Sequence, residues 1–162
     1  MTTAASAYET PLGQVPVARE LIRLLQHDME LTELHGDEEH SIEIQLPFLQ
    51  TVLKGFSLLP IMVWNPDVNG VGGFARSLER ILRGANAILV ASTDLHHLHS
   101  YADVRSRDAN VADALETFDL QAIRTVLAPE SCTVCGKVPV SIVLDTAKRL
   151  GANRILNLYR SN

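Results

Sequence analysis

Residues 87–99 read AILVASTDLHHLH, and this stretch decides the predicted fold. The first five residues are apolar, so we expect a buried strand over residues 87–91. The polar side chains begin where that strand ends. Because ligands of open α/β sheets lie beyond the carboxyl ends of the strands, residues 92–99 are the first candidates for chemistry.

The same alternation of apolar runs and helical periodicity extends along the rest of the chain. We expect two further buried strands, at residues 56–64 and 154–159. Helices are expected over residues 15–26, 37–54, 74–82, 103–117, 119–127 and 139–150, with a turn at residues 10–13. Pro47 lacks the N–H that would bond to the carbonyl of Glu43, so a kink is expected there. Apolar strands between helices predict an α/β/α sandwich around a mostly parallel sheet.

Composition limits the class of protein. The chain has 162 residues without a visible linker, which fits a single domain over residues 1–162. A net charge of −5 argues against nucleic-acid binding, because phosphate contacts need a basic surface. No apolar run is long enough to span a membrane, and the N-terminus lacks the features of a secretion signal. With only two cysteines, we expect a cytoplasmic protein.

The polar cluster at the end of the central strand contains Asp94, His96, His97 and His99. An aspartate and three histidines can bind a metal ion or act as a general acid and base, because imidazole titrates near neutral pH. The alternative is a polar loop whose histidines cap helices and face water. Three of the six histidines of the chain fall within four positions, which favours a functional cluster.

A second candidate is the pair Cys132 and Cys135, directly before the predicted helix 139–150. A thiolate is stabilised at a helix N-terminus, so Cys135 is a candidate reactive thiolate or soft metal ligand. A thioredoxin-like motif would need a different position in the fold, and a structural zinc site would need two more ligands. The remaining alternative is a pair of small buried thiols, which describes Cys132 better than Cys135.

The third candidate is the segment 39–43, EHSIE. Glu39 and Glu43 share one helical face, and His40 lies three residues before Glu43. A histidine beside a carboxylate can be a tuned base or can orient another ligand. The alternative, which spacing alone favours, is a solvated first turn of a helix.

These segments, in this order, resemble the Memo family, also called component B of the AmmeMemoRadiSam system. The matching pieces are residues 10–13 (TPLG), 39–43 (EHSIE) running into 45–48 (QLPF), 92–95 (STDL) with His97, and Cys135-Gly136 with Pro139. The resemblance implies a fold similar to class III extradiol dioxygenases, which use non-haem iron. It also implies a cleft of histidines and one cysteine, whose biochemical activity is poorly defined.

The resemblance assigns candidate roles to individual residues. His97, Asp94 and Cys135 take the places of the cleft histidine, aspartate and cysteine, and His97 and Cys135 are the implied metal ligands. His40 and Glu43 fall in the helix motif that lines the same cleft in the family. The catalytic set implied is therefore His97, Asp94, Cys135, His40 and Glu43, with non-haem iron or another divalent metal. His96 departs from the family pattern, and its role is open between an extra ligand and a space-filling side chain.

Family members begin with further residues that carry two more cleft histidines, and nothing similar precedes Thr10. The resemblance therefore implies an interior fragment with an incomplete fold and an incomplete site. Three functions follow from it: a metal-dependent, dioxygenase-like oxidoreductase, a non-catalytic module that binds a peptide or small ligand, and a remnant without activity. We also expect self-association or a second chain that supplies the missing strands.

Overall fold

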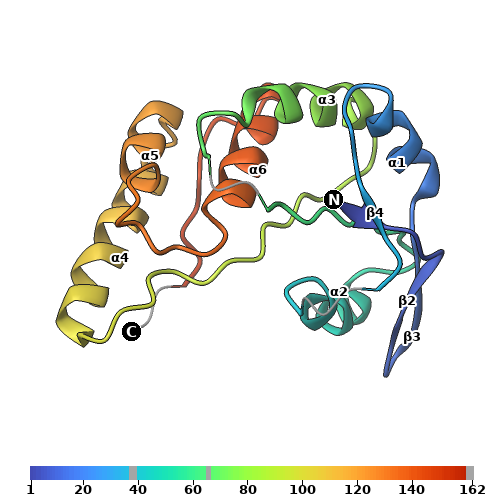
Figure 1. The fold of residues 1–162 in the computed structure, drawn as a ribbon, viewed down its shortest axis with the longest axis horizontal. Coiled ribbons are helices and arrows are strands. Elements are labelled where there is room, and N and C mark those ends of the chain that lie inside the picture. Colours follow the sequence, from blue (N-terminus) through green and yellow to red (C-terminus); the bar gives the residue numbers. More distant parts are fainter. Residues whose placement is uncertain (37–39, 65–66, 160–162) are drawn as a thin grey trace. The chain divides into compact units, whose positions relative to one another are not determined.

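A computed structural model describes residues 1–36, 40–64 and 67–159 (Figure 1). The chain divides into two compact units, Met1–Trp64 and Asn65–Asn162. Helices and short strands both occur among the described residues, so the chain is mixed α/β. The division does not test the prediction of a single domain over residues 1–162, which stays a prediction.

The first unit opens with a β-hairpin. Strand β2 (Ala7–Thr10) pairs with β3 (Gly13–Pro16) in antiparallel register, and Gly13 has the positive φ of 108° that this tight connection requires. The turn predicted at residues 10–13 is confirmed. The helix predicted from residue 15 is wrong at its start, because Val15 pairs with Tyr8 in the hairpin. Helix α1 covers only Arg19–Gln26.

The remainder of the first unit contains one more small sheet and a short helix. Strand β1 (Thr2–Thr3) pairs in parallel with β4 (Glu33–Leu34). The strand predicted at residues 56–64 is wrong over most of its length, since only Leu58 forms an isolated bridge, with Val17. Pro60 lies within this segment and has no N–H with which to extend a ladder.

The helix predicted over residues 37–54 is shorter in the structure. Residues 37–39 lie outside the described part of the chain. A 3₁₀ turn, η1 (Glu43–Gln45), leads into helix α2 (Leu46–Val52). The kink expected at Pro47 is wrong, because Pro47 stands in the first turn of α2, where its missing N–H interrupts no intrahelical bond.

The described residues of the second unit form four helices, all predicted from the sequence to within two residues at each end. They are α3 (Gly72–Leu82), α4 (Tyr101–Glu116), α5 (Leu120–Leu127) and α6 (Lys137–Arg149). Helix α6 packs against α3 and α5, and α4 packs against α5 (Figure 1). Ile123, Leu127 and Ile142 are buried where these helices meet. No helix in the described ranges is long and apolar enough to cross a membrane.

The two strands predicted in this unit are wrong. Residues 87–91 and 154–159 belong to no strand of the structure, and the side chains of Ile88 and Leu158 are 67% and 91% exposed. A strand is held by hydrogen bonds to a neighbouring strand, and none among the described residues pairs with either segment. The sheets that the described residues form are two pairs of short strands, both in the first unit, rather than one mostly parallel sheet.

Candidate functional site

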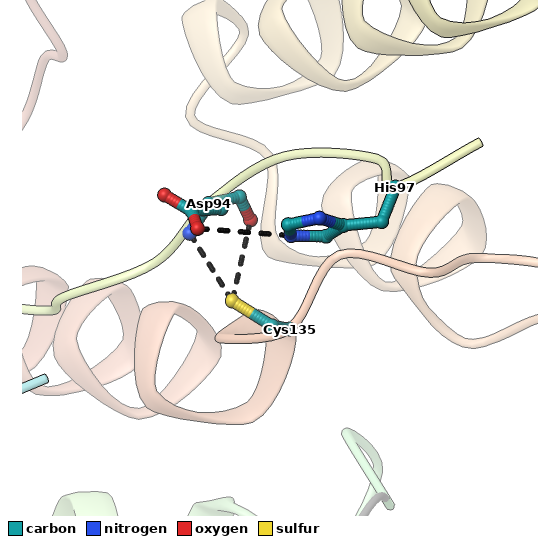
Figure 2. Close-up of side chains that lie close together, drawn as sticks. All are labelled: Asp94, His97 and Cys135. Carbon is teal, nitrogen blue, oxygen red and sulfur yellow. Dashed lines mark hydrogen bonds and ion pairs between the residues drawn. The ribbon is translucent and has the colours of Figure 1, made fainter. Parts of the chain in front are cut away.

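Three of the predicted site residues come together in the second unit. Asp94 and His97 lie on the loop that follows residues 87–91, and Cys135 lies two residues before the start of α6 (Figure 2). One ligand atom of each residue, a carboxylate oxygen, an imidazole nitrogen and the thiol sulfur, lies within 4.8 Å of the other two. All three side chains are exposed to solvent. We call this set the Asp94–His97–Cys135 cluster.

Direct contacts join the members of this cluster, as the dashed lines in Figure 2 show. The carboxylate Oδ2 of Asp94 lies 3.7 Å from Nε2 of His97. The main-chain N–H of Asp94 donates a hydrogen bond of 3.1 Å to Sγ of Cys135. The thiol of Cys135 in turn donates to the main-chain carbonyl oxygen of Asp94 at 3.6 Å.

A close approach of backbone at Gly136 makes these contacts geometrically feasible. The N–H of Gly136 donates a 2.8 Å hydrogen bond to Oγ1 of Thr93. A Cβ atom added at Gly136 would lie 2.4 Å from Cβ of Thr93 and 2.7 Å from the carbonyl oxygen of Ser92. Only glycine therefore lets the loop rest against the start of α6. The sequence analysis did not predict this close approach at Gly136, although a glycine beside a candidate cysteine could have indicated it.

The structure separates the other histidines of this loop from the cluster. The side chain of His96 is only 4% exposed, and its Nδ1 lies 2.9 Å from Oδ1 of Asp108 on α4. His96 is thus a buried, paired residue rather than a further ligand, and His99 is not among the residues that meet. Sequence reasoning missed Asp108, since an aspartate within an amphipathic helix is typical of a solvent-facing position.

The two cysteines differ as their positions predicted. Both are free thiols, Cys132 buried and Cys135 exposed. The interpretation of Cys132 as a small core residue is confirmed. Exposure leaves Cys135 accessible to a metal ion or a ligand.

His40 and Glu43 lie in the first unit, where Glu43 is the first residue of η1 and His40 lies three residues before it. Nδ1 of His40 is 2.5 Å from Oε1 of Glu43, and both side chains are largely exposed. The predicted neighbour relation of these two residues is confirmed. The predicted acidic pair with Glu39 involves a residue outside the described ranges, and the site roles of His40 and Glu43 stay predictions.

The sequence of this chain is similar to those of known proteins. A family model described as Memo-like protein matches residues 1–161. A MEMO1 family protein of Thermotoga neapolitana is 32% identical over 142 residues, which cover 85% of this chain and 51% of that protein. Similar relatives from Methanosarcina mazei and Aquifex aeolicus are 30% and 31% identical over 100% and 98% of this chain. The chain spans between 51% and 62% of the length of these three relatives.

Proposed function

The chain belongs to the Memo family, and from this premise we propose that the Asp94–His97–Cys135 cluster binds a divalent metal ion, non-haem iron or a similar one. The observation that carries the proposal is the convergence of three different ligand atoms within 4.8 Å. His97 and Cys135 are the proposed principal ligands, and Asp94 is the third. The chain spans only 51% and 62% of the length of two of these relatives. Any activity of a whole protein of this family is therefore a proposal for this chain.

The donor set fits such an ion. Imidazole and thiolate are ligands of iron, copper and zinc, and a carboxylate oxygen is acceptable to all three. Three protein ligands are the minimum of most catalytic sites, which keep a further position open for water or substrate. A bound ion would supply the Lewis-acid or redox chemistry of a dioxygenase-like oxidoreductase. His97, Cys135 and Asp94 would bind the ion. The carboxylate of Asp94 also lies next to the imidazole of His97.

The remaining parts of the proposal follow from the family. We propose that the complete fold is the α/β/α sandwich with a mostly parallel sheet, and that segments 87–91 and 154–159 become strands of it. The further ligands would then come from a second chain or from additional protein. His40 and Glu43 are proposed to contribute to the catalytic set. We propose a cytoplasmic location and a peptide or small molecule as ligand, without nucleic acid or membrane.

One observation favours a second candidate function. The side chains of Asp94 and His97 are 79% and 62% exposed, whereas redox chemistry at a metal is usually shielded from water. An open cluster of this kind suits a module that binds a peptide or small ligand without turnover. A remnant without activity is the third candidate.

Titration with Co²⁺ followed by absorption spectroscopy tests the metal site, because a thiolate bound to cobalt gives a characteristic charge-transfer band. We expect binding that is weak compared with that of a full-length relative, since the cluster offers only three ligands. The charge-transfer band should disappear in Cys135→Ser, and affinity should fall at least about tenfold in His97→Ala. His99→Ala, outside the cluster, is the matched control and should bind as the unmodified chain does.

Two results would change this view. Equal Co²⁺ affinity in the unmodified chain, His97→Ala and Cys135→Ser would remove the cluster as the metal site and favour the ligand-binding module. Tight one-to-one binding that His97→Ala abolishes would show that the local cluster is sufficient without further ligands.

A further inference from the structure

The pair formed by His96 and Asp108 lies next to the cluster but outside it. Oδ1 of Asp108 accepts a hydrogen bond of 3.0 Å from the main-chain N–H of His96 and lies 2.9 Å from Nδ1 of the same residue. The side chains of His96 and Asp108 are only 4% and 10% exposed.

The contact between His96 and Asp108 attaches the loop at a position between Asp94 and His97, the two proposed metal ligands on this loop. His96 directly precedes His97 and follows Asp94 by two residues. On the side of α6, the loop is held by the bond between Gly136 and Thr93, and by the N–H of His97, which donates to Oγ1 of Thr133 at 3.2 Å. Asp108 supplies the attachment to α4, so the loop is held from both sides.

We propose that Asp108 is a positioning residue: by binding both the backbone and the imidazole of His96, it holds Asp94 and His97 at the distance from Cys135 at which the three can share a ligand. The inference rests on the proposed metal-binding function for its purpose, but the fixation of the loop is testable without metal. A buried carboxylate with two short bonds to one residue restricts that residue far more than a solvated surface pair would. The two ligands beside His96 therefore start from a largely fixed geometry.

The test compares Asp108→Ala, which removes the acceptor, with Asp108→Asn, whose Oδ1 can still accept both bonds. Asp103→Ala removes an exposed carboxylate from the same helix and is the matched control. The first readout is amide hydrogen exchange of residues 93–97, measured without metal. The second is Co²⁺ affinity and the cobalt spectrum. Circular dichroism confirms that each variant retains its helices.

If Asp108 positions the loop, exchange at residues 93–97 accelerates at least about tenfold in Asp108→Ala, Co²⁺ affinity falls about tenfold, and Asp108→Asn restores both to within about twofold. The unmodified chain gives an independent check, should Asp108→Ala not fold. In it, the amide of His96 should exchange at least about tenfold more slowly than in an unstructured peptide.

Two results distinguish this inference from the proposed function. Unprotected amides at residues 93–97 in the unmodified chain, or unchanged exchange in a folded Asp108→Ala, would overturn the positioning role whatever the metal data show. Faster exchange in Asp108→Ala without Co²⁺ binding by the unmodified chain would uphold the positioning of the loop and overturn the metal site instead.

Discussion

The helices of the second unit and its two extended segments, residues 87–91 and 154–159, carry comparable apolar sequences but lie in opposite environments. Ile142 on α6 is 6% exposed, whereas Ile88, in the segment before the cluster, is 67% exposed. A helix satisfies its backbone within its own segment, so α6 needs only a neighbour for its apolar face. A strand needs another strand for its backbone as well. The same hydrophobicity therefore produces a core in one region and, as far as the described residues go, a surface without a partner strand in the other.

The largest effect expected from this difference is self-association through the extended segments. Ile88, Val90, Leu156 and Leu158 are all at least half exposed, and their segments pair with no strand in the described ranges. Exposed apolar segments of this kind favour strand pairing. At micromolar concentration the chain should sediment faster than a monomer. The double variant Ile88→Asp and Leu158→Asp should sediment as a monomer.

Asn86→Asp, an added charge at an exposed position outside the segment, is the control and should leave the assembly intact. If the unmodified chain is a compact monomer with a cooperative thermal transition, the expected association is wrong and the extended segments need no partner.

The next effect compares the loss of stability when a buried isoleucine and an exposed isoleucine are each replaced by alanine. Ile142→Ala should lower the free energy of unfolding by about 2–5 kcal/mol, because it opens a cavity between packed helices. Ile88→Ala should change it by less than about 0.5 kcal/mol, since the side chain is already exposed. Urea unfolding measures both, at a protein concentration low enough for the chain to be a monomer. Equal losses would mean that residues 87–91 are buried in solution.

A smaller effect is expected where the loop meets α6. Gly136→Ala should cost about 1–3 kcal/mol, because the new Cβ would lie 2.4 Å from Cβ of Thr93 and the loop must move. Gly72→Ala is the control: its Cβ would meet nothing closer than 3.8 Å, and α3 should gain slightly in stability. Thermal unfolding compares the two. A neutral Gly136→Ala would show that the loop does not rest closely against α6.

The smallest effect concerns a surface contact in the first unit. A hydrogen bond from Arg19, 2.7 Å long, and a second from Gln26 lower the pKa of Glu33. Because the folded pKa lies below the unfolded value, this stabilisation is present above the unfolded pKa of about 4.3 and disappears as the pH falls through the folded pKa. Glu33→Gln should thus be slightly less stable than the unmodified chain near neutral pH. Thermal midpoints that stay apart below about pH 3 would contradict this assignment.

The sequence predictions were correct for the helices of the second unit, which depend on local features, and wrong for its strands, which depend on a distant partner. The bounds of α3, α4, α5 and α6 could be predicted because helical periodicity is a local feature of the sequence. The Asp94–His97–Cys135 cluster could also be anticipated, since its residue types and the family resemblance singled them out. That residues 87–91 pair with no strand among the described residues could not be derived from that segment, because a partner strand is non-local. Asp108 was missed because its burial depends on the fold of the loop opposite α4.

The contact between Asp94 and Cys135 joins positions 41 residues apart in the chain. An ion held by both would close that stretch into a ring and act on the unfolded chain as a cross-link does, by reducing the number of conformations available to it. The unfolding temperature of the second unit would then rise with metal concentration, and a chelator would reverse the rise. With a site of this kind, the thermal stability of the fold would report the concentration of metal ions around the protein.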